Sequence, residues 1–325
     1  MACARLRPAD RQGGPHGWAG EMAVLVGADL AKSLRARIRG TVLFSEPLAR
    51  HTTFGIGGPA DLVVVPEDSQ DLKTALDFAR SGGLSVFVLG SGSNTLVRDG
   101  GIRGVVILLQ KFQDLRREGH VLTAGAGVRI SRVLAYCSKQ GLAGLEFLCG
   151  VPGTVGGAVW GNAGAWGGEI ADRVAHVHLI SQEAEDLILT REQIPFAYRS
   201  SGFPRGAVVI RATFALQPGE PTAIRQQISR WLIQRNASQP VEYRSAGSIF
   251  KNPPGDYAGR LVEASGVKGS RIGGAMISEK HGNFFVNLGG ARAADVLALI
   301  RLARERVRAL TGIDLELEIR VVGED

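Results

Sequence analysis

Three side chains that can bind a carboxylate and move a proton lie far apart along this chain of 325 residues. Arg199 follows an aromatic segment, Ser248 ends a Ser-Ala-Gly-Ser sequence, and Glu318 lies in an alternating segment near the C-terminus. A guanidinium can hold a carboxylate through two parallel hydrogen bonds, and hydroxyl or carboxyl groups in fixed positions can transfer protons. Each residue also has an ordinary interpretation: a surface arginine, a turn serine and a solvent-exposed strand residue.

A glycine-rich segment that follows the apolar residues 86–89 has the composition of a phosphate-binding loop. Its residues are Gly90, Ser91, Gly92, Ser93 and Asn94. Glycine lets successive backbone N–H groups converge on an anion, and the serine and asparagine side chains add donors. The dinucleotide fingerprint G-x-G-x-x-G is excluded, because position 95 is threonine and no amphipathic helix follows. We therefore expect a phosphate-binding loop of another type, with an ordinary tight turn as the alternative.

A second glycine-rich segment runs from residue 150 to residue 168. Its glycines are too frequent for a stable regular element. Val151, Val155, Val159 and Trp160 are interleaved with them, which a mobile surface loop does not require. The pattern predicts a long irregular loop that packs against a flat ligand and contacts its polar edges through backbone groups.

The apolar pattern around these segments predicts strands and helices in alternation, and hence an α+β fold. In the first stretch, strands are expected at 62–65, 86–89 and 105–109. The helix after the first strand can be capped by Asp68 or Ser69 and is stopped by two glycines at 82–83. The second stretch, 111–217, has expected strands at 120–124, 173–180 and 207–215 and an expected helix at 128–140.

In the third stretch, the pattern predicts helices at 221–235 and 293–310, and Gly312 ends the second one. A strictly alternating segment predicts a last strand at 315–321. Because side chains alternate across a strand, its charged residues share one face. They are Glu316, Glu318 and Arg320.

The composition is that of a globular protein with ample material for a core, with 45% hydrophobic and 21% charged residues. Three cysteines, Cys3, Cys137 and Cys149, fit neither a disulfide framework nor a metal motif. This favours a reducing cytoplasm and predicts no metal site. No apolar run of about 18 residues is present, so no membrane-spanning segment is expected.

The formal net charge of +7 is unevenly distributed. Residues 1–40 carry a surplus of four positive charges, because they contain seven Lys or Arg and three Asp or Glu. The modest surplus in the rest of the chain suits a pocket for small anionic molecules, and no nucleic-acid partner is expected. Within this leader, residues 1–20 show no periodicity and are expected to be disordered, so that Met22 is a second candidate start.

Six segments, in order from about residue 41 to residue 323, resemble the MurB family, the UDP-N-acetylenolpyruvoylglucosamine reductases of peptidoglycan synthesis. They are HTTFGIGGPA at 51–60, GSGSN at 90–94, the glycine-rich 150–164, FAYRS at 196–200, SAGSIFKNP at 245–253 and EIR at 318–320. The resemblance implies a FAD-binding domain of the vanillyl-alcohol-oxidase type over 41–217, in lobes of about 41–110 and 111–217. A C-terminal α+β substrate-binding domain would follow at 218–325.

The same resemblance implies an activity. NADPH would reduce a non-covalently bound FAD, which would then reduce the enolpyruvyl ether of a UDP-sugar to UDP-N-acetylmuramate. Ser248 matches the family's proton donor, Arg199 its carboxylate-binding arginine and Glu318 its catalytic glutamate. By the same comparison we expect a monomer that acts in the cytoplasm.

The resemblance also implies the residues that contact the ligands. Those expected to contact FAD are Thr53, Gly90, Ser91, Gly92, Ser93, Asn94, Gly150, Pro152, Gly153, Thr154, Gly156, Gly157, Ala158, Asn162, Ala163 and Gly164. The candidates for contact with the substrate are Tyr198, Gln239, Lys251, Asn252, Arg271 and Arg320, for which ordinary solvent-exposed residues are the alternative. Some family members insert a tyrosine-bearing loop after the strand at 207–217, but here a helix and a short connection fill that interval. The chain therefore resembles the loop-lacking type II form.

Two other functions stay open at this point. Another FAD enzyme on the same scaffold, such as an alcohol or sugar oxidase, would use oxygen and could attach flavin covalently at His51. A binding protein without turnover would keep its activity after the loss of Ser248. A nucleic-acid binder is disfavoured, because aromatic residues make up only 6% of the chain and no recognition motif is present.

Overall fold

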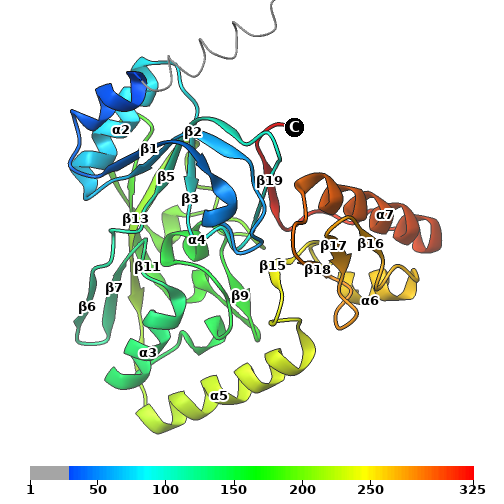
Figure 1. Cartoon of the computed structure of the whole chain (residues 1–325). Helices are drawn as coiled ribbons and strands as arrows, with labels where there is room; N and C mark the ends of the chain where they lie inside the picture. The colour runs from blue at the N-terminus through cyan, green and yellow to red at the C-terminus, as the bar shows by residue number, and fades with distance from the viewer. Residues whose placement is uncertain (1–28) are drawn as a thin grey trace, which may run out of the picture.

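The computed structural model describes residues 29–325, so the predictions about the disordered leader and Met22 lie outside the described residues. In Figure 1 two lobes lie on the left and a smaller domain lies on the right. A short helical segment at 29–35 precedes the first strand. Within residues 29–325, no helix has both the length and the hydrophobicity needed to cross a bilayer.

The first lobe is built on a four-stranded sheet in the order β1-β2-β5-β3. Its strands are β1 (Thr41–Pro47), β2 (Pro59–Val65), β5 (Ile102–Leu108) and β3 (Val86–Leu89). β1 is antiparallel to β2, whereas β2, β5 and β3 run parallel. Successive residues of β2 and β5 alternate between two apolar clusters, one on each face, which is the arrangement that buries a parallel sheet on both sides. The three predicted strands of this stretch are confirmed.

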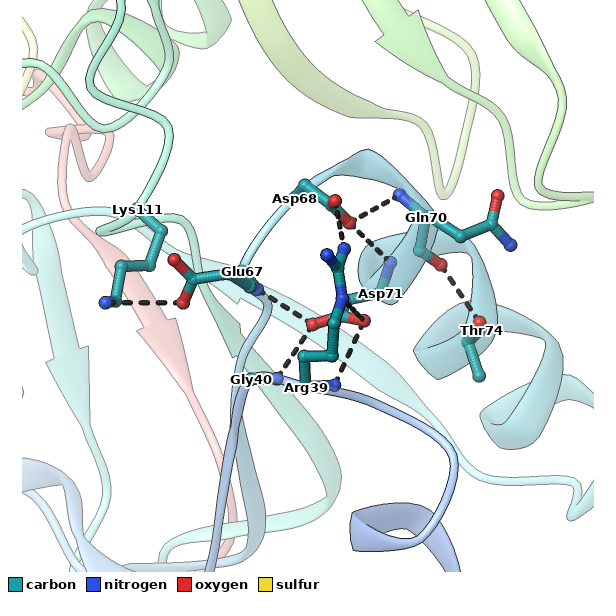
Figure 2. Close-up of polar contacts among 8 residues, drawn as sticks. All are labelled: Arg39, Gly40, Glu67, Asp68, Gln70, Asp71, Thr74 and Lys111. Atoms are coloured by element: carbon teal, nitrogen blue, oxygen red, sulfur yellow. Dashed lines mark hydrogen bonds and ion pairs between the residues drawn. The ribbon is translucent and has the colours of Figure 1, made fainter.

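Helix α2 (Ser69–Ser81) covers one face of this sheet and begins where predicted. The Asp68 carboxylate caps it by accepting two backbone N–H groups of the first turn. Figure 2 shows the neighbouring carboxylate of Asp71, which is buried and accepts the backbone N–H groups of Arg39, Gly40 and Glu67. This side chain therefore holds the segment before β1 against the start of α2.

The second lobe is a five-stranded antiparallel sheet in the order β12-β11-β13-β7-β6. Its strands are β12 (Asp186–Thr190), β11 (Val174–Ile180), β13 (Val208–Ala215), β7 (Val121–Gly125) and β6 (Leu115–Glu118). Helix α3 (Ile130–Gln140) and a small pair, β8 (Leu142–Ala143) with β14 (Gln217–Pro218), lie beside the sheet. The three predicted strands and the helix are confirmed, whereas the edge strands β6 and β12 were not predicted.

The prediction of an irregular loop throughout residues 150–168 was wrong in part, because helix α4 (Val155–Trp160) lies inside it. The helix packs tightly on the end of β7. A Cβ atom on Gly156 would lie only 2.9 Å from the Cβ of Ala126, so the glycine permits close packing here rather than mobility. A hairpin of β9 (Gly164–Ala165) and β10 (Gly168–Glu169) follows.

Four short 3₁₀ turns also occur within residues 29–325. They are η1 (Leu48–His51), η2 (Glu146–Leu148), η3 (Ile170–Asp172) and η4 (Arg191–Gln193).

The C-terminal domain is a four-stranded antiparallel sheet in the order β15-β18-β17-β16, covered by two helices. Its elements are β15 (Arg244–Ser248), β16 (Arg271–Ile272), β17 (Ala275–Ile277), β18 (Phe284–Asn287), α6 (Ala258–Ala264) and α7 (Ala293–Thr311). Helix α5 (Pro221–Ser238) runs along the second lobe and leads into β15 (Figure 1). Both predicted helices are confirmed, and α7 ends at Gly312 in a left-handed conformation.

The predicted strand at 315–321 was wrong in extent, because regular pairing covers only β19 (Arg320–Val322), which lies parallel to β4 (Thr95–Val97). Residues 315–319 form only one isolated antiparallel bridge, between Leu317 and Phe250, whose flanking backbone bonds join Lys251 N to Glu316 O and Glu318 N to Ile249 O. The structure also bears on the ordinary interpretation of Glu318 as a solvent-exposed strand residue, which its burial disfavours. Glu316 is exposed, whereas the Glu318 side chain is only 18% exposed.

The C-terminal domain is closely joined to the first lobe. Its apolar core includes Phe54, Ile56 and Leu96 from the first hundred residues. The Asp99 carboxylate accepts the backbone N–H groups of Ala293 and Ala294 at 2.9 and 3.0 Å, which are free donors of the first turn of α7. The last strand of the chain, β19, therefore lies beside the first lobe, as Figure 1 shows.

Candidate functional site

A cavity of about 780 Å³ lies where the two lobes and the C-terminal domain meet. The loop after β3, the segment around α4, the residues after Arg199 and the end of β15 all contribute to its wall. Its volume is in the range of sites for small organic ligands and cofactors.

Most of the residues predicted from the sequence line this cavity. They are Gly90, Ser91, Gly92, Ser93, Asn94, Pro152, Gly153, Thr154, Gly156, Gly157, Ala158, Ala163, Gly164, Arg199, Gln239, Ser248, Glu318 and Arg320. The three chemistry-bearing side chains and the two glycine-rich segments are thus brought together, although they span more than two hundred residues of sequence.

Seven predicted residues do not line the cavity. They are Thr53, Gly150, Asn162, Tyr198, Lys251, Asn252 and Arg271. The side chains of Thr53 and Asn162 instead form hydrogen bonds to backbone groups of other segments. Thr53 Oγ1 donates to Ser245 O at 2.7 Å, and the buried carboxamide of Asn162 accepts a backbone N–H from one side and donates to Ala197 O on the other.

The other outlying residues lie close to the surface. Tyr198 is 52% exposed, and the Arg199 guanidinium carbon lies 5.1 Å from its ring centroid. Lys251 pairs with Glu316 at 3.2 Å, and Arg271 Nε donates to the nearby carbonyl of Gly273 at 3.0 Å.

Arg199 and Glu318 form an ion pair at the cavity wall. Arg199 Nε donates to Glu318 Oε1 at 2.8 Å, and its Nη1 donates to Gly164 O at 3.0 Å. These contacts fix the guanidinium on two sides. Arginine has five N–H donors, so others stay free to bind a ligand carboxylate.

The backbone of Arg199 is in the left-handed region, with φ of 57°. It lies in a tight turn in which Ala197 and Ser200 exchange two backbone hydrogen bonds, of 2.9 and 3.0 Å. For a residue other than glycine this conformation costs about 1–2 kcal/mol, and such strain concentrates at functional sites. The turn directs a long cationic side chain toward the cavity.

Burial raises the pKa of the Glu318 carboxyl above its usual range, and the Arg199 charge opposes only part of that rise. The cause is the loss of solvent around the side chain. The carboxyl is therefore able to accept and share a proton in this cavity.

Ser248 is positioned by a β-bulge. The pairing of β15 with β18 shifts register between Ser245 and Ser248, and Gly247 lies at this shift with φ of 76°. A bulge inserts a residue, bends the strand and changes the direction of the next side chain. Here it places Ser248 at the cavity wall.

The loop of residues 90–94 has the features of an anion cradle. Ser91 Oγ is buried and has no hydrogen-bond partner among residues 29–325. A buried hydroxyl without a partner carries a desolvation penalty that a bound ligand can remove. Ser93 Oγ already donates to Pro152 O at 3.0 Å, and Asn94 Nδ2 donates to Glu318 O at 3.1 Å. The loop is thus fixed on both sides and keeps one free hydroxyl, which fits a phosphate-bearing cofactor such as FAD.

Arg235 also lines the cavity and was missed from the sequence. Its side chain lies against Gly150, and burial lowers the pKa of its guanidinium. No carboxylate within residues 29–325 pairs with it. A sequence signal existed, because Arg235 precedes the predicted Gln239 by one helical turn and so lies on the same side of the chain.

A second cavity, of about 460 Å³, shares Ser248 with the first. It is lined by Ser248, Asn252, Tyr257, Gly259, Arg260, Glu263, His281 and Asn283. Asn252, absent from the first cavity, therefore lies at the second, where its Oδ1 accepts the Ala258 N–H at 3.1 Å. Ser248 is the one predicted residue common to both.

Other reactive groups lie elsewhere. His51, a candidate for covalent flavin attachment, pairs with Glu46 at 3.0 Å and does not line the cavity. Cys149 is buried, and burial raises the pKa of its thiol, which disfavours a thiolate. Residues 29–325 contain no cluster of three or more His, Cys, Asp or Glu side chains arranged to hold a metal ion.

Two protein-family models match the chain. The model of the UDP-N-acetylenolpyruvoylglucosamine reductase C-terminal domain matches residues 239–322, and that of a FAD-binding domain matches residues 60–187. These matches and the structure confirm the α+β fold class predicted from the sequence, with a FAD-binding domain followed by a C-terminal domain.

Curated relatives and one solved structure extend the match to nearly the whole chain. The UDP-N-acetylenolpyruvoylglucosamine reductase of Moorella thermoacetica is 48% identical over 295 residues, covering 91% of this chain and 98% of its own. That of Clostridium botulinum is 41% identical, covering 87% and 93%. The crystal structure of the Thermus caldophilus reductase (MurB) superposes with a TM-score of 0.76 at 39% identity, covering 87% and 99%. This chain belongs to the UDP-N-acetylenolpyruvoylglucosamine reductase family.

Proposed function

We propose that this protein is an NADPH-dependent, FAD-containing reductase of peptidoglycan synthesis. It would convert the enolpyruvyl ether of UDP-N-acetylglucosamine to UDP-N-acetylmuramate, as a monomer in the cytoplasm. The observation that carries the proposal is that Arg199, Ser248 and Glu318 line the same cavity as both glycine-rich segments. A carboxylate-binding group and proton-transfer groups thus lie beside a place for a redox cofactor.

The glycine-rich segments are the proposed holders of FAD. The free hydroxyl of Ser91 and the backbone of the 90–94 loop suit its diphosphate, and the segment at 152–164 supplies backbone groups for the rest. Thr53 and Asn162 would contribute indirectly, by hydrogen bonds that hold the backbone around the cavity, and Gly150 by leaving room for the Arg235 side chain. Bound FAD supplies the hydride of the reaction, which it takes from NADPH.

The proposed task of Arg199 and Glu318 is to hold the substrate carboxylate. The reduction adds a hydride to one carbon of the enol ether and a proton to the other, and negative charge develops on the carboxylate between these events. The fixed guanidinium of Arg199 stabilises that charge. Glu318, with its raised pKa, can be protonated and share its proton with the carboxylate instead of repelling it.

Ser248 is the proposed donor of the proton to carbon. A serine hydroxyl is a weak acid, but a carbon that carries enolate character is a strong base, so fixed geometry makes the transfer feasible. The bulge at Gly247 provides that geometry.

The remaining contacts are proposed for the sugar nucleotide. Because Ser248 opens onto both cavities, the reacting end can lie in the first while the nucleotide end reaches Asn252 in the second. Gln239 and Arg320 would contact the substrate from the first cavity, and Tyr198 from the surface beside Arg199. Lys251 and Arg271 lie outside both cavities, so any contact with the diphosphate would come from their long side chains.

Anaerobic stopped-flow absorbance at the flavin maximum tests the proposal. NADPH should bleach the yellow protein, and UDP-N-acetylenolpyruvoylglucosamine should restore the colour. Ser248→Ala should slow the second step by about 10²–10⁴-fold and leave the first unchanged. A protein that holds no flavin, or whose reduced form ignores the sugar nucleotide and reacts with oxygen, would refute the assignment and favour a binding protein or an oxidase.

A further inference from the structure

Asn283 is a buried side chain that holds the backbone immediately after Ser248. It is 3% exposed. Its Oδ1 accepts the Phe250 N–H at 2.8 Å, and its Nδ2 donates to Phe250 O at 2.8 Å. Its own carbonyl accepts the Ile249 N–H at 2.9 Å. One residue thus makes three hydrogen bonds to the two residues that follow Ser248.

The residues on either side of Phe250 bind the segment that carries Glu318. Ile249 O accepts the Glu318 N–H at 2.8 Å, and the next residue along, Lys251, donates its N–H to Glu316 O at 2.9 Å. The backbones of Ser248 and Glu318 are therefore connected through a single dipeptide. Any shift of that dipeptide moves both side chains relative to Arg199.

A side chain is needed here because the sheet ends. The last registered pair of β15 with β18 is Ser248 with Phe284, just beyond the bulge. Phe250 is completely buried, so its N–H and C=O cannot turn to solvent when the ladder stops. The Asn283 carboxamide, with one donor and one acceptor side by side, replaces the missing strand.

Asn283 is itself held in place. Its N–H donates to Nδ1 of His281 at 3.1 Å, and the intervening Gly282 donates its N–H to Glu263 Oε1 at 3.1 Å. The turn that carries the carboxamide is therefore anchored to α6, so the side chain can transmit a fixed position to the dipeptide.

We propose that Asn283 is a positioning residue for the reduction, acting through Ile249 and Phe250 to set the place of the Ser248 hydroxyl relative to Glu318. This inference rests on the proposed function, in which Ser248 delivers a proton. A misplacement of about 1 Å in a reacting group can cost roughly 10²-fold in rate. Asn283 lines the second cavity together with Ser248, and its side-chain hydrogen bonds go to Phe250 and not to either glycine-rich segment, so its loss should affect the substrate step and leave flavin binding unchanged.

The test uses Asn283→Leu, which keeps the volume and removes both polar atoms, and Asn283→Asp, which keeps the acceptor for the Phe250 N–H. With Asn283→Leu, the return of colour on adding UDP-N-acetylenolpyruvoylglucosamine should slow by about 10–100-fold. Bleaching by NADPH and flavin content should be unchanged. The solvent deuterium isotope effect on the substrate step should rise, because proton delivery becomes the slow event. The rate of the substrate step in Asn283→Asp should lie between those of the unaltered protein and Asn283→Leu. The aspartate variant also provides the test if the leucine variant does not fold.

Asp71→Ala is the matched control. Asp71 is also buried and also holds backbone through three hydrogen bonds (Figure 2), but it lies in the first turn of α2, in the first lobe. It should lower the melting temperature without changing either step or the isotope effect. If Asn283→Leu or Asn283→Asp lowers the melting temperature in the same way and leaves the substrate step and its isotope effect unchanged, Asn283 is only structural and the inference is overturned. If the unaltered protein shows no substrate-dependent return of colour, it is the proposed function that fails.

Discussion

Arg199 and Glu318 are two residues of the cavity wall whose local conformation or burial is unfavourable for the fold. Arg199 adopts a left-handed backbone that only glycine adopts freely, and Glu318 keeps a carboxyl where burial disfavours its charge. Neither arrangement helps the fold. Both make sense when a carboxylate ligand binds between a fixed guanidinium and a carboxyl that can hold a proton.

Glu318→Gln should therefore separate activity from stability. Because the folded pKa of Glu318 is raised, the carboxyl destabilises the fold once the pH lies above that pKa, and this cost disappears as the pH falls toward the unfolded value. Glutamine removes the cost and keeps an acceptor for Arg199. Turnover should fall by about 10²–10⁴-fold. The melting temperature of the variant should equal or exceed that of the unaltered protein at pH 7–8, and this advantage should shrink in acid. A melting-temperature loss that is largest at neutral pH would contradict this account.

The same raised pKa predicts the pH dependence of the substrate step. Protonated Glu318 can share its proton with the substrate carboxylate, whereas ionised Glu318 repels it. The rate of colour return should therefore fall as the pH rises through the folded pKa of Glu318. Glu318→Gln should be slower overall and should lose this dependence. Stopped-flow rates measured across the pH range would decide the point.

Gly247 allows a matched comparison with Gly312, because both have φ of 76°. A Cβ atom added at Gly312 would meet nothing within 4 Å, and one added at Gly247 would meet only Ser93 O at 4.0 Å, an ordinary contact. Alanine at either position must adopt a left-handed conformation, at a cost of about 1–2 kcal/mol. Gly247→Ala and Gly312→Ala should lower the melting temperature to similar extents. Only Gly247→Ala should slow turnover, because the bulge directs Ser248. Equal turnover in the two variants would show that the bulge does not matter for the chemistry.

At the scale of elements, helix α5 is the connection that completes the cavity. Only Ile224 of this helix is buried, and Leu232 is 39% exposed. The helix is tied to the β9–β10 hairpin by the stacked rings of Trp231 and Trp166, whose centroids lie 5.5 Å apart. Its last turn then brings Arg235 and, just after it, Gln239 to the cavity wall.

Arg235→Gln should weaken ligand binding without destabilising the fold. Burial disfavours the charged guanidinium, and no carboxylate of the described residues compensates it, so an anionic ligand in the cavity is the partner that would. Loss of one charge-assisted contact should raise the KM for the sugar nucleotide or for NADPH by about 10-fold or more. Arg230→Gln, on the exposed side of the same helix, is the control and should change neither constant. A large drop in melting temperature for Arg235→Gln alone would instead indicate a structural role.

At the scale of the whole molecule, the C-terminal domain and the first lobe behave as one packing unit. Phe54, Ile56 and Leu96 lie in the core of the C-terminal domain, and Asn287 Nδ2 donates to Phe54 O at 3.0 Å. The carboxylate of Asp99, which belongs to the first lobe, caps the N-terminus of α7. The site, which draws on all three parts, is held in register by these contacts.

Asp99→Ala should consequently shift the unfolding of the entire molecule. Loss of a helix cap typically costs about 1 kcal/mol. Flavin release and the loss of far-ultraviolet circular dichroism should coincide in one thermal transition, before and after the substitution, and both should move to lower temperature together. Two separate transitions would show that the C-terminal domain unfolds on its own.

The sequence predicted much of this architecture for local reasons. The apolar runs of β2, β3 and β5, the cap at Asp68 and the stop at Gly312 all depend on residues within a few positions of one another. The predictions that were wrong concern segments whose structure depends on contacts with distant parts of the chain. Helix α4 forms among glycines because Gly156 packs on Ala126, and the strand at 315–321 is cut short because its partner is the irregular segment after Ser248.

The sequence by itself determined the fold class, the glycine-rich segments, the candidate trio and the family that they resemble, because each depends on residue types and short-range spacing. The tertiary structure decided which side chains meet. Arg199 pairs with Glu318 across 119 positions, Arg235 lines the cavity with no carboxylate partner among residues 29–325, and Asn283 holds the dipeptide after Ser248. Such contacts depend on how distant segments pack, and the burial that raises the pKa of Glu318 exists only once the whole chain has closed around it.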